Sequence, residues 1–302
     1  MKKKSAMLCL FLLGVIFGGC FSTKILVHSS ELQTNITPDA PEEEKSYYVE
    51  NERQLKRERE KKREYRIRYY TLTVQKMEYQ EEYIRALKEE TKEKLRIEEG
   101  KLQLGYTVQN SVDELYNQLE EVQSELEMIY SQKDCYKGVI RAYGSIYSNM
   151  KLPEDLDILD GDYVSAFRTD NLQVKYYDNQ IKNYQSYLEK YKDASNYEDI
   201  RIQRDLVGLD KEQYEMELQA YICEKELQYK SIAQNLTQKS RELKTLNEKI
   251  ATNQILLENG KITRIQLMEL ETEQKKLIYE KMSLICDGEC VRYVLENQIE
   301  GI

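Results

Sequence analysis

The chain has 302 residues, of which 33% are charged and only 40% apolar or aromatic, with 25 tyrosines and no tryptophan. Its formal charge is −9, which argues against a general nucleic-acid binder because such proteins present basic surfaces. So few apolar side chains can fill narrow seams between helices more readily than one thick core. The composition therefore favours elongated helices over compact globular domains.

Residues 1–21 are typical of an export signal. Three lysines at positions 2–4 precede an apolar run from Ala6 to Phe21, and Cys20 follows two glycines. The run is shorter than the roughly 20 residues that cross a bilayer comfortably. A lipoprotein signal with a lipid anchor at Cys20, ordinary cleavage and an uncleaved anchor remain open. Each alternative places the rest of the chain in the cell envelope, associated with the outer side of a membrane.

Residues 22–46 are expected to form a flexible tether, since they are polar and contain Pro38 and Pro41. The basic segment 51–68 follows, with nine Lys or Arg against four Glu. It can be interpreted as a solvated helix face stabilised by charge pairs along the helix. It can also be interpreted as a segment attracted to an anionic envelope surface, and the sequence leaves both interpretations open.

The first helical hairpin is expected over residues 47–150, with its turn at Gly105. No proline occurs between Pro41 and Pro153, so long helices can form on both sides of the glycine. After the turn, apolar residues recur at alternating intervals of three and four, which is the pattern of a coiled-coil seam. These residues are Val112, Leu115, Leu119, Val122, Leu126 and Ile129.

A linker over residues 151–163 separates this hairpin from a second one over residues 164–302. The linker contains the single internal proline and an acidic cluster. The second hairpin has its turn at Gly260, and its helical pattern shows a break near residues 194–199. The fold class predicted from these patterns is all-α, with two tandem long antiparallel coiled-coil hairpins.

The helical segments that follow Gly105 and Gly260 are here called the return arms. They are related by an offset of 155 residues, which predicts an internal duplication. Gly105 then corresponds to Gly260, and Cys135 corresponds to Cys290. The seam residues Leu115, Val122, Ile129 and Tyr136 correspond to Leu270, Leu277, Leu284 and Val291. A glycine at each turn allows the positive φ with which a helix ends and the chain reverses. Thr107 and Thr263 are expected to cap the returning helices through their hydroxyl groups.

The sequence offers no catalytic or metal site, so we expect no enzyme activity and no cofactor. The single histidine, His28, lies in the predicted tether, and no glycine-rich phosphate loop is present. Cys286 and Cys290 share one helix face and could supply two metal ligands, but a metal site needs three or four. The ordinary interpretation is that these two cysteines are small apolar residues that fill the seam between packed helices.

The C-terminal arm resembles the outer-membrane efflux protein (TolC-like) family. The resemblance rests on residues 256–301, where an apolar turn with Gly260, Ile262 and Thr263 is followed by Leu267, Leu270 and the closing Gly301. The family has Ile or Val followed by Ser or Thr at the second and third positions after the glycine. The first copy, residues 102–115, has Gly105 but the reverse order, with Thr107 before Val108.

This resemblance implies a hollow helical cylinder built from three chains, each of which contributes four helical arms. The turns would form the tip of the cylinder, where a periplasmic adaptor docks and a membrane pump delivers substrate. The tip residues carried over by position are Gly105, Tyr106, Thr107, Gly260, Lys261, Ile262 and Thr263. The alternative is that these residues only close the hairpins.

One feature of the family is missing from the sequence. The family inserts two membrane strands into each half, and each such strand needs about 9–11 residues of alternating character. Residues 65–74 and 196–206 are the only candidates here, and neither leaves room for a pair of strands. We therefore expect the helical part of the family's structure alone.

Two hypotheses of function follow. In the first, the chain is an export component, a helical duct working with an adaptor and a pump. In the second, it is a structural coiled-coil envelope lipoprotein, a spacer or scaffold that conducts nothing. A duct wall must contact neighbours on both flanks, so its arms need two apolar seams, whereas an isolated hairpin needs one. Met128, Tyr130 and Tyr136 give the first return arm a hint of a wider apolar stripe.

Overall fold

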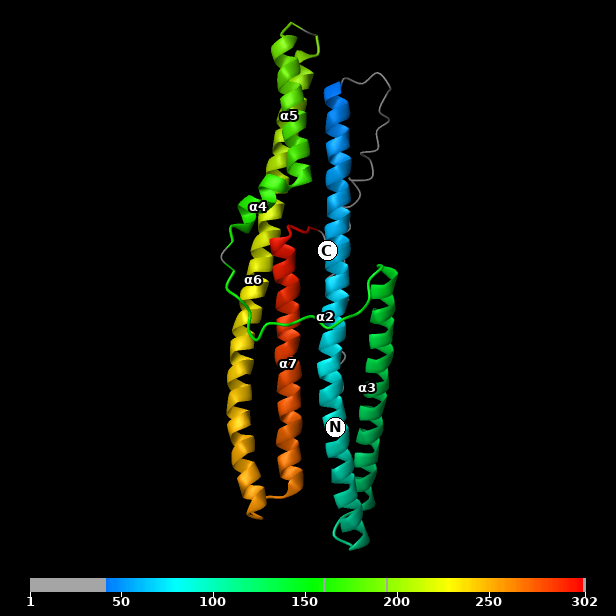
Figure 1. Cartoon of the computed structure of the whole chain (residues 1–302). Helices are drawn as coiled ribbons and strands as arrows, with labels where there is room; N and C mark the ends of the chain where they lie inside the picture. Colours follow the sequence, from blue (N-terminus) through cyan, green and yellow to red (C-terminus); the bar gives the residue numbers. More distant parts are fainter. Residues whose placement is uncertain (1–41, 160, 194, 301–302) are drawn as a thin grey trace. The chain divides into compact units, whose positions relative to one another are not determined.

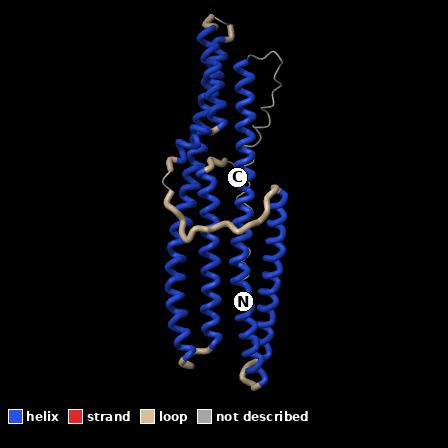
Figure 2. The backbone as a smooth tube through the Cα atoms, in the orientation of Figure 1, coloured by secondary structure: helices blue, strands red, loops and turns tan. Residues whose placement is uncertain are grey.

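A computed structural model describes residues 42–159, 161–193 and 195–300, and these residues form helices joined by loops and turns, with no strand among them (Figure 2). The predicted all-α fold with two long antiparallel hairpins is confirmed. The predicted export signal, Cys20 and most of the predicted tether lie outside the described residues. None of the described helices combines the length and the apolar character that crossing a membrane requires.

The chain divides into two compact units, one made of residues 1–62 with 298–302 and the other of Arg63–Asn297. The boundary falls within the first long helix, α2, which spans Glu42–Gln103. Within the first unit, the segment of α2 up to Lys62 is a single continuous run of helix.

The second unit contains two antiparallel helix pairs (Figure 1). The C-terminal part of α2 packs against α3, which spans Gln109–Ala142, and α6 (Tyr197–Glu258) packs against α7 (Arg264–Glu296). The first pair buries Ile84, Val122, Leu126 and Ile129 at its seam. The second pair buries Leu246, Ile250, Leu267 and Leu277. Both seams are narrow, as expected for a chain that is poor in apolar residues.

Two short helices cover the N-terminal half of α6. They are α4 (Tyr163–Asp170) and α5 (Leu172–Lys190), and the side chains of Asp162 and Asn171 accept the backbone N–H groups that cap them. After α5 the chain reverses before α6 begins (Figure 1), so the break predicted near residues 194–199 is a change of direction. A core cluster joins this region to the end of α7: Phe167, Leu218, Ile222, Tyr229, Ile232, Val291 and Leu295.

Two of the predicted boundaries shift in the structure. Helix α2 begins at Glu42, within the residues predicted to form the tether. The connection between the hairpins already begins after Ala142, the last residue of α3, and it ends where α4 starts at Tyr163. Gly144 explains the earlier start, because its φ of 76° ends the helix.

The duplication that the sequence predicted is visible in the helix bounds. Helices α2 and α6 each have 62 residues, and both the first and the last residue of α6 lie 155 positions after those of α2. Helices α3 and α7 start with the same offset and have 34 and 33 residues. The offset found between the return arms therefore extends over the whole of both long outgoing helices.

Candidate docking site at the hairpin turns

The first turn closes with two backbone hydrogen bonds around Gly105. The N–H of Gly105 donates to the carbonyl of Leu102 at 3.0 Å, and the N–H of Tyr106 donates to the carbonyl of Lys101 at 2.8 Å. The φ of Gly105 is 73°. This pair of bonds around a residue of positive φ is the Schellman motif, which satisfies the last carbonyl groups of a helix and turns the chain away.

The second turn repeats this arrangement. The N–H of Gly260 donates to the carbonyl of Leu257, and the N–H of Lys261 donates to the carbonyl of Leu256, both at 2.9 Å. The φ of Gly260 is 65°. Each of these donors and acceptors lies 155 residues after its counterpart in the first turn. The two glycines therefore have one backbone role in both hairpins.

The two returning helices start differently. Thr263 caps α7 in a reciprocal capping box with Gln266. The equivalent position in the first hairpin is Val108, which has no side-chain hydrogen bond to the start of α3. The prediction that Thr107 caps α3 is therefore wrong. Thr107 lies one residue too early for that role, and its hydroxyl group donates to Glu98 on α2 instead.

The surfaces of the two turns also differ. The first turn exposes three apolar side chains, with Leu104 71%, Tyr106 80% and Val108 64% accessible. At the second turn, Ile262 packs against the core of its own hairpin, whereas Gly260, Lys261 and Thr263 are exposed. Of the predicted tip residues, those of the first turn thus lie in an apolar surface and those of the second in a mainly polar one.

Both turns lie at the same end of the second unit (Figure 1). Lys94, shortly before the first turn, forms an ion pair with Glu269, shortly after the second, at 2.7 Å. Further contacts between α2 and α7 follow along both helices. These are the ion pairs Lys275–Glu82 at 2.9 Å and Lys76–Asp287 at 3.1 Å, and the stacked rings of Tyr83 and Tyr279. The two hairpins therefore contact each other along α2 and α7.

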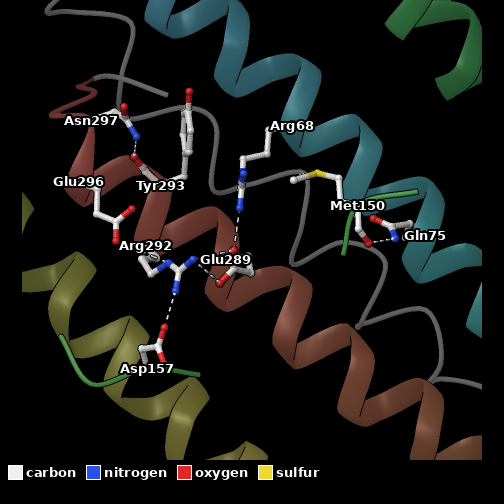
Figure 3. Close-up of polar contacts among 9 residues, drawn as sticks. All are labelled: Arg68, Gln75, Met150, Asp157, Glu289, Arg292, Tyr293, Glu296 and Asn297. Carbon is white, nitrogen blue, oxygen red and sulfur yellow. Dashed lines mark hydrogen bonds and ion pairs between the residues drawn. The ribbon is translucent and has the colours of Figure 1, made fainter. Parts of the chain in front are cut away.

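A buried carboxylate fixes the far end of this contact (Figure 3). Glu289 on α7 is 3% exposed and accepts a hydrogen bond from Arg68 on α2 at 2.6 Å. Arg292 also contacts Glu289, and its guanidinium lies 3.0 Å from Asp157 in the linker. The sequence analysis did not identify this cluster. Charged residues lie close to Glu289 on both sides in the sequence, so no local pattern indicated that it is buried.

The titratable groups of the second unit include two buried thiols on α7 and a carboxylate near the first turn. Burial raises the pKa of the Cys286 and Cys290 thiols to about 12, so both stay protonated at neutral pH. Among the described residues, no group of three or more His, Cys, Asp or Glu could hold a metal ion. At the first turn, hydrogen bonds from Lys101 and then Thr107 lower the pKa of Glu98, which favours its ionised form.

A second apolar seam runs along α6, and the sequence analysis missed it. Besides its buried stripe, α6 carries exposed apolar residues at alternating intervals of four and three, broken by Gln213. They are Ile202, Leu206, Leu209, Met216, Ala220, Cys223 and Leu227, and the five large ones are 48–66% accessible. We call this set the outer seam. The heptad interval is the signal by which the sequence could have revealed it.

Comparison with solved structures identifies the fold. The structure of CusC, whose crystallographic description concerns folding and transmembrane channel formation, matches with a TM-score of 0.66 and 11% identity over 86% of this chain and 84% of CusC. The Campylobacter jejuni outer membrane channel CmeC matches with a TM-score of 0.54 and 10% identity over 78% of this chain and 61% of CmeC. No family model matches the sequence, and no curated protein matches it.

The chain thus has the helical architecture of TolC-like outer-membrane channels. At this level of identity the likeness shows the fold, and the resemblance inferred from the sequence is confirmed in that respect. The described residues contain no strand, in agreement with the expectation that only the helical part is present. The docking role of the turn residues stays a prediction.

Proposed function

We propose that this protein is a subunit of a TolC-like export duct in the cell envelope, a homotrimer that works with a periplasmic-type adaptor and a membrane pump. The fold likeness to two channel proteins supports a role as a wall segment. The long, narrow hairpins fit the same role, because a chain with such narrow seams can enclose a space only together with further copies.

The outer seam of α6 carries this proposal. Each helix pair already buries one seam within the chain, which is all that an isolated hairpin needs. A wall segment needs a further apolar surface toward its neighbour. The outer seam is such a surface, since its large residues are about half exposed or more and follow a heptad repeat.

The first turn is the proposed adaptor contact. Leu104, Tyr106 and Val108 present apolar side chains at the point where two helices end, and clusters of exposed apolar residues commonly mark protein interaction sites. The second turn, with Gly260 and Lys261, contributes polar groups at the same end of the unit. Together they offer an adaptor an apolar contact flanked by polar ones.

The oligomeric state tests the proposal. Mass photometry of the purified full chain in detergent is expected to show a species of about three times the chain mass of 35.9 kDa. The double variant Leu209→Glu with Met216→Glu places two charges on the outer seam and is expected to yield monomers. Both residues are more than 60% exposed, so we expect the helices themselves to be retained, as measured by circular dichroism.

A matched control adds the same charge outside the outer seam. Gln228→Glu with Asn235→Asp changes two exposed polar positions of α6 and should leave the trimer intact. A wild-type monomer, or a trimer that survives the two glutamates in the outer seam, would contradict the duct and favour a non-conducting coiled-coil scaffold.

A further inference from the structure

The outer seam is flanked by acidic side chains. In its heptad register, the positions that border the apolar residues are 203, 205, 210, 212, 217, 219, 224 and 226. Six of these eight are Asp or Glu and two are Gln, so no basic residue borders the outer seam. Asp210, Glu212 and Glu217 are exposed and form no ion pair with a described residue. A helix that binds along this surface should therefore be basic.

The N-terminal part of α2 is such a helix. Residues 53–62, here called the basic stretch, contain six Lys or Arg and two Glu, a net formal charge of +4 in a chain of −9. Arg53, Lys56, Arg57 and Arg59 are exposed. None of the six cations forms an ion pair with a described residue.

Most cations nearer the C-terminal end of α2 do form ion pairs. Six of the seven cations between residues 76 and 101 form ion pairs, either along α2 or with α7, whereas Lys88 forms none with a described residue. The six are Lys76, Arg85, Lys92, Lys94, Arg96 and Lys101. Most cations in the C-terminal half of α2 are thus paired within the chain, whereas the cations of the basic stretch form no ion pair with a described residue.

The two surfaces correspond to each other in the duplicated sequence. With the offset of 155 residues, the basic stretch corresponds to residues 208–217 of α6, the centre of the outer seam, where four acids and one lysine give a net charge of −3. The two equivalent segments of the duplicated helices therefore carry opposite net charges.

We infer that the outer seam of α6 binds the basic stretch of α2 in a neighbouring copy of the chain. The inference rests on the proposed homo-oligomer and names the surfaces that join its subunits. The carboxylates of Asp210, Glu212 and Glu217 pair with the cations of the basic stretch. The aliphatic stems of those Lys and Arg side chains, together with Leu55, cover the apolar residues of the outer seam.

Charge reversal tests this pairing. The basic variant Lys56→Glu, Arg57→Glu and Arg59→Glu and the acidic variant Asp210→Lys, Glu212→Lys and Glu217→Lys are each expected to raise the concentration needed for half assembly at least about tenfold, because like charges then face each other. A chain that carries all six changes should assemble within about threefold of wild type. In wild type, added salt should weaken assembly.

A control variant reverses three cations of α2 that already have ion-pair partners. Lys92→Glu, Arg96→Glu and Lys101→Glu change the net charge as much as the basic variant does, but the acidic variant should not compensate for them. If the six-change chain fails to recover while the glutamates in the outer seam still abolish assembly, the pairing is wrong and the duct proposal survives. If wild type is monomeric, the duct proposal fails first.

Zero-length coupling identifies the chains that meet. Carbodiimide joins a lysine to a carboxylate that is in direct contact, so a mixture of ¹⁴N- and ¹⁵N-labelled chains should give mixed-label peptides linking Lys56 or Lys61 to Asp210 or Glu212. Only same-label links would place the contact within one chain and overturn the inference. Normal assembly of the basic variant, with loss of binding to phosphatidylglycerol vesicles, would assign the basic stretch to a lipid surface and overturn it too.

Discussion

Arg68 on α2 donates a hydrogen bond to Glu289 on α7 over 2.6 Å, and this ion pair links the two hairpins across a buried contact. The side chain of Glu289 is 4% exposed and that of Arg68 is 24% exposed. A carboxylate this far from water is tolerated only with cations beside it, and Arg292 is the second one. The pair therefore fixes the register of α2 against α7.

We expect Glu289→Ala to lower the free energy of unfolding by about 3 kcal/mol, because it leaves two arginines without their buried counter-charge. Urea denaturation followed by circular dichroism measures this loss. The double variant Arg68→Met with Glu289→Leu removes both charges and should recover most of the stability. If the double variant is as unstable as Glu289→Ala alone, the cost comes from packing and not from the unpaired charge.

A glycine in a turn and a glycine inside a helix should respond in opposite directions to substitution by alanine. Gly260→Ala forces a Cβ onto a residue whose φ is 65°, which should cost about 1–2 kcal/mol. Gly208→Ala lies inside α6, where an added Cβ meets no atom within 4 Å, and should stabilise the chain by about 0.5–1 kcal/mol. Thermal melting of both variants checks the signs. An equal effect at both positions would show that Gly260 is not needed for the reversal.

Because only one of the two returning helices has a side-chain cap, substitutions at the two capping positions should change the stability in opposite directions. Thr263→Ala removes the capping box of α7 and should cost about 1 kcal/mol. Val108→Thr supplies the missing cap at the equivalent position of α3 and should gain a similar amount. Urea unfolding of both variants measures the two changes in the free energy of unfolding. A loss of stability in Val108→Thr would mean that this backbone cannot accept a cap, despite its extended φ and ψ.

The sequence predicted the hairpins well because their signals are local. Proline-free helical stretches, a glycine at each turn and heptad spacing after Gly105 and Gly260 each depend on residues that are close in sequence. The contact between the hairpins could not be predicted in the same way. Arg68 and Glu289 are 221 residues apart, and nothing in their local patterns indicates that they meet.

Thr107 and the outer seam show two further limits of the sequence analysis. A threonine after a glycine turn has the chemistry of a cap, but a displacement of one residue put Val108 at the capping position. The outer seam has the same heptad pattern as a buried one. Only the structure shows that α6 uses a different stripe, which includes Leu218 and Ile222, for its contacts within the chain. Periodicity thus predicts that a stripe is apolar but does not tell which partner covers it.

The first hairpin should lose stability in acid through Glu81 on α2. Burial acts to raise the pKa of this carboxyl, but hydrogen bonds from Lys133 on α3 and from Arg85 outweigh it and lower the pKa below the ordinary value of 4.5. A carboxyl whose pKa is lower in the folded state stabilises that state above its unfolded pKa. This contribution is lost as the pH falls through the lowered folded value.

Glu81→Gln should therefore reduce the melting temperature at pH 7, and the difference from wild type should shrink as the pH is lowered from about 5 towards 3. Calorimetry at a series of pH values measures this convergence. Glu120→Gln, at an exposed position of α3 without an ion pair to a described residue, is the matched control and should show little difference at any pH. A constant gap between Glu81→Gln and wild type across the whole series would mean that the loss reflects shape or packing, since a contribution from the ionised carboxylate must disappear once that group is protonated.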